Sequence, residues 1–377
     1  MTRHQFHSSR SPVIRCGVGL VFLFVLAATA QAGNTFSVTN LVTNSQSANM
    51  APVTDPNLVN PWGVSFSPTS PLWVSDNGTG VSSLYSITNN DQVTVMNSPG
   101  LFPVTIPGGG PTGQIANTNT AAFGGDHFVF VSTTGAVTGW QPSFGNTAQV
   151  IVAANSANSY DGAAQVTVNG DTYLLAANNK TGNIDVIAGN SGAPALSGNF
   201  KDPNLPTGSM PYNVQTLNGV VYVTYTNNIV DAFSTTGTFL GRVGTGGTLS
   251  DPWGLAIAPT SFGSLAGDLL VGNLASGQIS VFGIGGNNTF TALGLLNGTN
   301  GAPIVIPDLW SLYVGNNAAA GSGSNQQVYF TAGTNGYQAG LLGVIQSVPE
   351  PSSAVLGLIA VGVLAGRWQW KNRRRAV

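Results

Sequence analysis

Charged residues are scarce in this 377-residue chain and make up only 6% of it. Between residues 33 and 347 there is no glutamate, and three basic residues stand against twelve aspartates, so this middle section has a net charge of −9. It lacks the basic stripe of a nucleic-acid-binding protein, which disfavours a DNA or RNA function. The usual helix formers Glu, Lys and Arg are rare, while Gly, Asn, Thr, Ser and Val are abundant, and this composition indicates strands and turns.

The middle section also has no cysteine and a single histidine, His127. Zinc and copper sites need clustered His or Cys, so neither site is expected. A Ser-His-Asp triad would have to use His127, which follows Asp126 in a predicted loop and is interpreted more simply as an exposed turn residue. No catalytic residue is therefore assigned. Calcium stays open as a cofactor because it accepts Asp, Asn and backbone carbonyl ligands, which are plentiful.

Residues 1–32 have the organisation of a secretory signal peptide. A basic leader (1–15) precedes an apolar stretch (17–28), and residues 30–32 form a small-residue cleavage box. The alternative is an uncleaved membrane anchor, which the short apolar core and the cleavage box disfavour. Cys16 lies before the apolar core and would leave with the signal peptide, so the mature protein is expected to contain no disulfide.

The last 30 residues combine three features in a fixed order. These are the sequence Val348-Pro349-Glu350-Pro351, the uncharged stretch 352–366, and a basic end with Arg373, Arg374 and Arg375. As a helix the uncharged stretch would cover about 22 Å, less than a hydrocarbon core of about 30 Å, so it is a marginal membrane span. The positive-inside rule puts the arginines in the cytoplasm and everything before Val348 outside.

This ordered combination closely resembles the PEP-CTERM sorting signal of Gram-negative bacteria. The resemblance implies that an exosortase, which is a membrane protease, recognises and removes the tail, so that the inner membrane holds the protein only transiently. We therefore expect a signal peptide (1–32), one exported domain (33–347) and a sorting signal (348–377). The final location would be the cell surface or the extracellular space.

One hairpin pattern recurs along the middle section. Its clearest copies, "LWVSDNGTGVSSLY", "LLAANNKTGNIDVI" and "LLVGNLASGQISVF", combine an apolar strand, a polar turn with glycine and a return strand. Weaker copies bring the turn positions to 80, 135, 182, 228, 277 and 340, a mean spacing of 52 residues. Six such units predict an all-β fold, a six-bladed β-propeller of four-stranded blades, with a β-sandwich or a parallel β-solenoid as the alternatives.

A second motif precedes most of these hairpins and is expected to form the innermost strands: "NPWGVSF", "PTGQIAN", "SYDGAAQV", "PYNVQTL", "DPWGLAI" and "DLWSLYV". In a propeller, these strands start on the face where the hairpin turns lie. The residues expected to gather at that mouth are Trp62, Asp76, Tyr160, Asp161, Asn178, Tyr212, Asp251, Trp253, Asn273 and Trp310. Aromatic rings beside Asp and Asn suit the binding of a sugar. The alternative is that the rings fill gaps between blades while Asp and Asn cap turns.

The segments "DPNLVNPWGVSFSPTSPLWVSDNGTG" and "DPWGLAIAP" resemble an uncharacterised family of exported bacterial proteins with NHL-like repeats, many of which carry the same sorting tail. The resemblance implies a propeller but no activity. Two functions stay open. One is a non-catalytic surface or matrix protein that binds an exopolysaccharide or another exported protein. The other is a calcium-assisted hydrolase or lyase, for instance a lactonase, with Asp76, Asp161, Asp251 or Asp308 around one ion, which the lack of glutamate disfavours.

Overall fold

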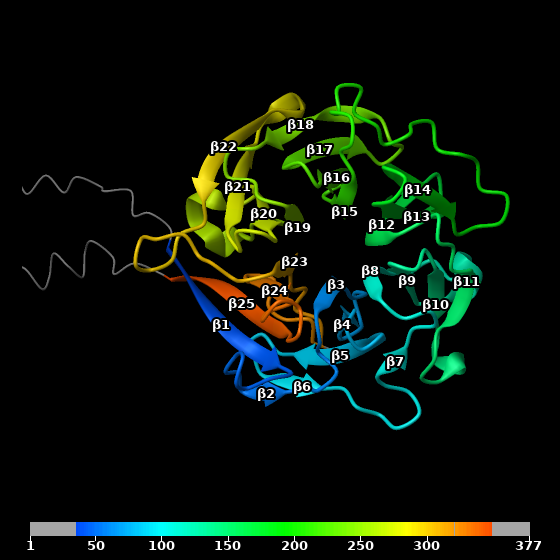
Figure 1. Cartoon of the computed structure of the whole chain (residues 1–377), viewed down its shortest axis with the longest axis horizontal. Coiled ribbons are helices and arrows are strands. Elements are labelled where there is room, and N and C mark those ends of the chain that lie inside the picture. The colour runs from blue at the N-terminus through cyan, green and yellow to red at the C-terminus, as the bar shows by residue number, and fades with distance from the viewer. Residues whose placement is uncertain (1–34, 320, 349–377) are drawn as a thin grey trace, which may run out of the picture. The chain divides into compact units, whose positions relative to one another are not determined.

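The computed structural model describes residues 35–319 and 321–348. Six sheets stand around a central axis, and the chain passes through them in order (Figure 1). The fold is the six-bladed β-propeller that the repeats predict, which excludes the sandwich and the solenoid. The predicted signal peptide and residues 349–377 of the sorting signal lie outside the described residues.

Blades 1 to 5 each begin at the channel and add strands outward. Blade 1 contains β3 (Pro61–Ser65), β4 (Leu72–Asp76), β5 (Val81–Ile87) and β6 (Val93–Val95), with the short β7 (Val104–Thr105) paired to β5. Blade 2 contains β8 (Pro111–Ala116), β9 (Phe128–Ser132), β10 (Val137–Trp140) and β11 (Gln149–Val152). Blade 3 has three strands rather than the predicted four: β12 (Tyr160–Val168), β13 (Asp171–Asn178) and β14 (Asn183–Ala188).

Blades 4 and 5 return to four strands. Blade 4 contains β15 (Pro211–Leu217), β16 (Val220–Tyr225), β17 (Ile229–Ser234) and β18 (Phe239–Thr245). Blade 5 contains β19 (Pro252–Ile257), β20 (Leu269–Asn273), β21 (Ile279–Ile284) and β22 (Phe290–Leu295). In each of blades 1 to 5, one of the predicted inner-strand motifs therefore forms the strand next to the channel.

Blade 6 joins the two ends of the propeller. Its inner strands are β23 (Leu309–Val314), β24 (Val328–Ala332) and β25 (Leu341–Val348). The first described strand, β1 (Thr35–Thr43), pairs antiparallel with β25, so that Thr35 faces Val348, and β2 (Val53–Thr54) pairs with β1 (Figure 1). This pairing closes the ring and leaves no open sheet edge between the first and last blades.

The hairpin turns follow the predicted chemistry in blades 1 to 5. Gly80 has a φ of 71° and Asn228 a φ of 62°, a region that Gly and Asn tolerate. In blade 6 the connection is longer, and Gly340 stands at its end rather than at its tip. Glycine is needed there for a different reason, because a Cβ atom at residue 340 would lie 1.9 Å from the carbonyl oxygen of Leu58.

Small residues let the inner strands approach one another closely. A Cβ atom on Gly63 would lie 2.4 Å from the carbonyl oxygen of Thr112, and one on Gly113 would lie 2.3 Å from the backbone nitrogen of Ala163. Each distance is far inside van der Waals contact, so these two positions exclude any side chain. The crowded axis expected from the motif is therefore present.

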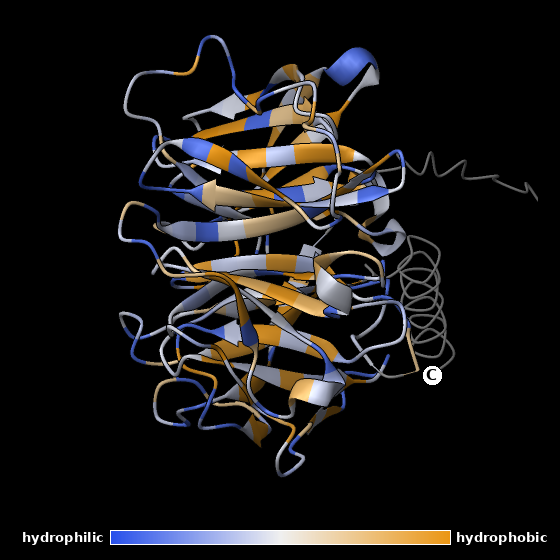
Figure 2. Cartoon of the chain, turned by 90° about the vertical axis from the view of Figure 1, so that its right-hand side faces the viewer, coloured by the Kyte–Doolittle hydropathy of each residue, from blue (hydrophilic) through white to orange (hydrophobic). Residues whose placement is uncertain are grey.

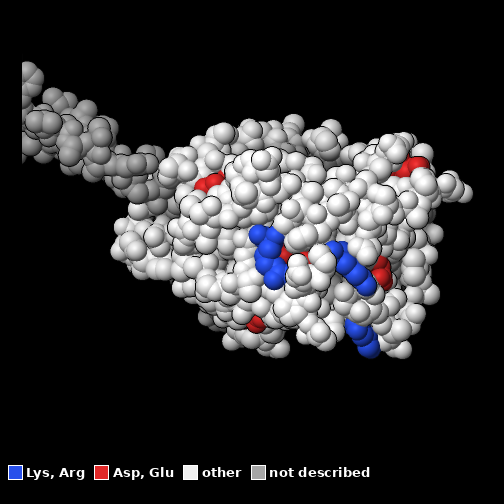
Figure 3. All heavy atoms as spheres, turned by 90° about the horizontal axis from the view of Figure 1, so that it is seen from above, with Lys and Arg blue, Asp and Glu red and all other residues white. Residues whose placement is uncertain are grey.

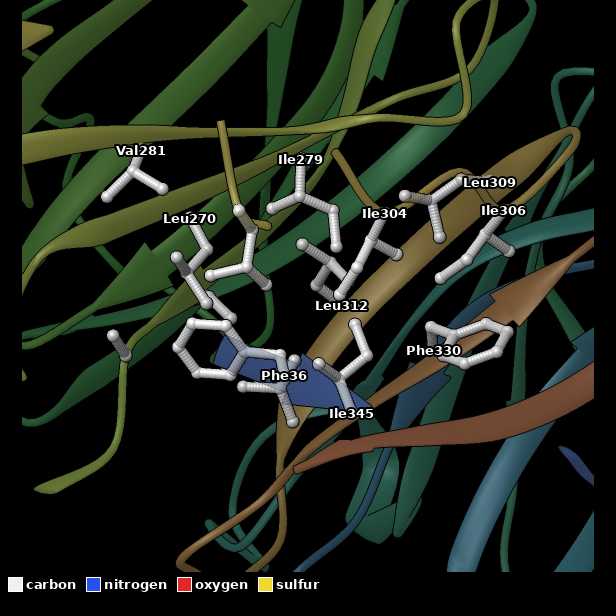
Figure 4. Close-up of a cluster of buried hydrophobic side chains, with 14 of the residues drawn as sticks. Phe36, Leu270, Ile279, Val281, Ile304, Ile306, Leu309, Leu312, Phe330 and Ile345 are labelled. Atoms are coloured by element: carbon white, nitrogen blue, oxygen red, sulfur yellow. The ribbon is translucent and has the colours of Figure 1, made fainter. Parts of the chain in front are cut away.

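The hydrophobic core is divided among the interfaces between blades. Between blades 5 and 6, Phe36 of β1 and Ile345 of β25 pack with Leu270, Ile279 and Phe330, each of them at most 1% exposed (Figure 4). Apolar residues run through the middle of the sheets, and polar residues gather at the loops (Figure 2). Burial of both sheet faces explains why strands such as β4 have no exposed position.

The remaining described elements are short. Four 3-10 turns occur in the described residues: η1 (Phe123–Gly125), η2 (Pro142–Phe144), η3 (Thr260–Leu265) and η4 (Gly286–Asn288). No helix within 35–319 and 321–348 is long and apolar enough to cross a membrane. Charged groups are few on the face of the propeller that Figure 3 shows, as the low charge content of the sequence requires.

Candidate functional site

Every inner strand is irregular near its start. In β15, for example, pairing to β16 skips from Pro211 to Asn213, which leaves Tyr212 without a cross-strand partner. Such bulges redirect a side chain away from the ordinary alternation of a strand. The other five inner strands have the same irregularity, so that each inner strand has one equivalent residue that the pairing skips. These residues are Trp62, Thr112, Asp161, Tyr212, Trp253 and Trp310. The bulges thus single out six positions, five of which carry a residue predicted for the mouth.

Three of these residues form one aromatic group, which we call the tryptophan cluster: Trp62, Trp253 and Trp310. The rings of Trp62 and Trp310 stack at 3.7 Å between centroids, and Trp253 meets them edge-on at 6.3 and 5.6 Å. The Nε1 of Trp310 donates to the side-chain oxygen of Asn60 at 3.0 Å. Trp253 and Trp310 are only 3% and 5% exposed. The predicted tryptophans do come together, but largely as a packed unit.

Acidic and tyrosine side chains surround this cluster. Tyr337 lies 5.8 Å from the Trp310 ring. Burial raises the pKa of Tyr212, and the carboxylates of Asp251 and Asp161 add to that rise. Burial also raises the pKa of Asp161 to about 7, against a smaller opposing effect of its hydrogen bond with Asn179. We call this set, which is Asp161, Tyr212, Asp251, Asp308 and Tyr337, the acidic rim.

The other predicted mouth residues are buried at strand ends near the hairpin turns. Asp76, Asn178 and Asn273 have no exposed surface, and Tyr160 is 3% exposed. The side-chain oxygen of Asn178 accepts from the backbone N–H groups of Lys180 and Thr181, which caps the hairpin turn. Asn273 donates to the Ser280 hydroxyl, and Tyr160 donates to Asp185. Their positions favour the turn-capping and packing alternative, and a binding role for them stays a prediction.

The four aspartates that the hydrolase or lyase alternative places around one calcium ion lie in two different places. Asp161, Asp251 and Asp308 belong to the acidic rim, whereas Asp76 is buried in blade 1 beside Ser83 and Asp55. No group of three or more His, Cys, Asp or Glu that could hold a metal ion occurs in the described part of the chain. His127 is exposed. One ion cannot therefore have all four aspartates as ligands.

The central channel contains a cavity with a volume of about 760 Å³. It extends along the inner strands from Trp253 to the loops that follow them, and Phe66, Asn218 and Gln326 lie at that end. It therefore opens on the face opposite the hairpin turns. Its described lining contains no Asp, Glu, Lys, Arg or His, and its polar side-chain groups are amides, hydroxyls and the indole N–H of Trp253.

Five residues of this lining carry a buried polar atom without a hydrogen-bond partner. They are Ser65 (Oγ), Gln165 (Oε1), Thr216 (Oγ1), Trp253 (Nε1) and Tyr313 (Oη). Buried polar groups are nearly always paired, and the exceptions commonly contact water or a ligand. Donors and acceptors are both represented, so the channel suits a neutral ligand that has hydroxyl groups.

Sequence reasoning placed the mouth on the hairpin face and missed these channel residues. The signal was present, because the inner-strand motifs contain Gln114, Gln165 and Gln215. All three line the channel. A strand shows side chains to alternate faces, but the bulge near each strand start shifts that alternation, so the motif alone does not tell which residues point inward.

Comparison with known proteins identifies the tail. Residues 347–375 match the family model of the PEP-CTERM protein-sorting motif. The chain is therefore an exported propeller protein that this motif anchors through its C-terminus until exosortase processing. The predicted sorting signal is confirmed.

Relatives of the whole chain are distant and indicate no activity. Two uncharacterised proteins of Acanthamoeba polyphaga mimivirus are 27% and 25% identical to it. The alignments cover 84% and 82% of this chain and 81% and 85% of the relatives. Among solved structures, a glucose dehydrogenase has 11% identity and a TM-score of 0.49, and a streptogramin B lyase has 12% identity and a TM-score of 0.47. Both alignments cover 84% of this chain, and they cover 100% and 98% of those proteins respectively.

Proposed function

We propose that the processed protein is a non-catalytic binding module of the cell surface or extracellular matrix, and that its central channel takes up a neutral, hydroxyl-rich ligand such as a segment of an exopolysaccharide. The observation that carries this proposal is an uncharged channel with amide and hydroxyl side chains in its lining, five residues of which carry a buried polar atom without a partner. The sorting motif supports the location, because it belongs to an exported chain.

The chemistry of the lining favours a sugar over a charged ligand. Side-chain amides donate and accept at once, as sugar hydroxyls do, and the indole N–H of Trp253 supplies a further donor at the inner end. A volume of about 760 Å³ lies within the range of small-molecule sites. General acid–base chemistry needs a titratable group near the ligand, and apart from the phenol of Tyr313 the described lining has none. These features support binding rather than hydrolysis.

The proposal is tested by calorimetric titration of the full chain, purified in mild detergent, with neutral oligosaccharides and with the exopolysaccharide of the source organism. Gln165→Ala removes an unpaired amide from the lining and should weaken binding about tenfold, since one hydrogen bond contributes about 1 kcal/mol or slightly more. Gln92→Ala is the matched control, because Gln92 is exposed on the β5–β6 turn.

The two variants must differ for the proposal to hold. Equal affinity of Gln165→Ala and wild type for a bound glycan would remove the channel as the site. A charged ligand that binds the channel while neutral sugars do not would contradict the proposed ligand class. Hydrolysis of a lactone or glycoside by the wild-type protein would favour the enzyme alternative.

A further inference from the structure

One four-residue segment occurs twice in the propeller. Asp-Pro-Asn-Leu stands at residues 55–58, before β3, and again at residues 202–205, before β15. In both copies the aspartate Oδ1 accepts the backbone N–H two residues on, at 2.9 Å from Asn57 and 2.8 Å from Asn204. Asp55 and Asp202 are 3% and 6% exposed. The two segments thus form the same turn and hold a buried carboxylate at the same place in blades 1 and 4.

In blade 4 a cation lies between this aspartate and a second one. Arg242 of β18 donates from Nε to Asp231 Oδ1 at 3.1 Å, and its Nη2 contacts Asp202 Oδ2. Asp231 has no exposed surface. Two buried carboxylates in one place require such compensation, because an unpaired buried charge is costly.

Blade 1 has the acids without the arginine. Counted from the hairpin turn, β4 and β5 of blade 1 have the same cross-strand register as β16 and β17 of blade 4. Asp76 therefore occupies the position of Tyr225, and Ser83 occupies the position of Asp231. The second carboxylate has therefore moved to the neighbouring strand. Asp76 is 0% exposed, and neither of its carboxylate oxygens has a hydrogen-bond partner of good geometry. The nearby Ser83 Oγ also has none.

At the position in blade 1 that corresponds to Arg242 of blade 4, the structure has a cavity. Continuing the β5–β6 register beyond the Tyr85–Val95 pair puts Asn97 opposite Ser83, where Arg242 stands opposite Asp231. Asp55, Asn57, Ser83 and Asn97 line a cavity of about 200 Å³ at this point. Asp55 and Asp76 are near enough that both raise the pKa of Tyr85, whose hydroxyl donates to Asp55 Oδ2 at 2.8 Å.

We propose that a divalent cation, preferentially Ca²⁺, binds between Asp55 and Asp76 and replaces in blade 1 the guanidinium that Arg242 supplies in blade 4. The donors available are the two carboxylates, the Ser83 hydroxyl and the side-chain oxygens of Asn57 and Asn97. These are hard oxygen donors without His or Cys, which suits Ca²⁺ and its irregular coordination better than zinc or copper. Water that enters the cavity completes the ligand set.

The position gives this ion a structural role. Tyr85, Leu72 and Val74 of blade 1 pack in one cluster with Leu342 and Val344 of blade 6. Asp55 follows β2 directly, and β2 is held by the closing strand β1. An ion between Asp55 and Asp76 therefore fastens the closing segment to blade 1. The site is separate from the channel and does not depend on the ligand proposed there.

The test is a calcium titration of the full chain after treatment with EDTA and removal of the chelator. The wild-type protein should bind one Ca²⁺ per chain, and its melting temperature should rise by about 5 °C when free Ca²⁺ exceeds its Kd about a hundredfold. Asp76→Asn removes one ligand charge and should weaken Ca²⁺ binding more than tenfold. Asp202→Asn alters the matching aspartate of blade 4 and should keep the wild-type calcium response.

Melting of the wild type and of Asp76→Asn without calcium separates the effect of the ion from the effect of the substitution itself. In EDTA, Asp76→Asn should melt no lower than wild type, because Asn has nearly the same shape as Asp and carries no charge into the buried site. The wild type should become the more stable of the two only when Ca²⁺ is added. Tb³⁺ binding, followed by luminescence excited through Tyr85, gives a second readout that needs no change in stability. A wild-type protein with no response to Ca²⁺ or Tb³⁺, or an Asp76→Asn variant that responds equally, would overturn the site and leave Asp76 as a buried neutral acid.

Discussion

The indole rings of Trp62 and Trp310 stack with centroids 3.7 Å apart and planes 21° from parallel. Trp62 belongs to the inner strand of blade 1 and Trp310 to that of blade 6. The hydroxyls of Ser311 and Thr331 also donate to the carbonyl oxygen of Trp62. Contacts of blade 6 with blade 1 at the axis thus add to the pairing of β1 with β25 at the rim of the propeller.

Removal of the Trp310 ring should destabilise the propeller. Trp310 is 5% exposed, and a buried Trp→Ala change costs about 3–5 kcal/mol of the free energy of unfolding. Urea denaturation of Trp310→Ala measures the loss. Tyr337→Ala is the control, because Tyr337 contacts the same ring but is 41% exposed, and it should cost about 1 kcal/mol or less. Equal losses in the two variants would show that the stack is not a stabilising contact.

The pH dependence of stability should report Asp161. Because burial raises its pKa to about 7, the folded state keeps a proton that the unfolded state loses near its ordinary pKa of 3.8. The folded protein therefore loses stability as the pH rises from 4 to 7, by up to about 4 kcal/mol. Asp161→Asn should match the wild type at pH 4 and exceed it by about 3–4 kcal/mol at pH 8. Parallel stability curves for the two proteins would contradict the raised pKa.

Arg242 should stabilise the folded protein as long as Asp202 and Asp231 are both present. Its replacement by Met leaves two buried carboxylates without a cation, and we expect a loss of about 2–4 kcal/mol, since the arginine itself is partly exposed. Lys201→Met, at an exposed position, is the control and should change the free energy of unfolding by less than about 0.5 kcal/mol. Restoration of stability in the triple variant with Asp202→Asn and Asp231→Asn would assign the loss to the charges.

The closing strand can be tested by deletion. Without residues 35–43, the hydrogen-bonding edge of β25 has no partner and Ile345 loses its contact with Phe36. An unpaired edge beside an exposed core favours association between chains. Light scattering after size-exclusion chromatography should detect oligomers or aggregates, with a lower melting temperature. A monomer that melts like the wild type would show that β1 is dispensable.

Mass spectrometry of the secreted form tests the two processing events. We predict a start near Gly33 and an end near Pro349 to Pro351, because the sorting motif at 347–375 directs removal of the tail. The secreted form should therefore lack Arg373, Arg374 and Arg375. Their recovery from the culture medium on an otherwise intact chain would contradict exosortase processing.

Local chemistry was enough to predict much of the fold. The positive-φ turns at Gly80 and Asn228 and the inner-strand motifs depend on neighbouring residues, so they are visible in a single repeat. The role of β1 is not, because its partner β25 lies about 300 residues away and the segment belongs to no repeat. The stacking of Trp62 on Trp310 likewise joins the first and last blades, which no local pattern records.

The pairing of Thr35 with Val348 sets an order of events during export. The strand that leaves the membrane first can pair only with the strand that leaves last, so blade 6 is completed after nearly the whole chain has been delivered. Until then Phe36 has no core to enter, and the first blade has an open side. Long-range pairing of this kind is slow and exposes apolar surface to other chains. We therefore expect the nascent protein to depend on chaperones on the far side of the membrane, and to resist proteases only once its final strand arrives.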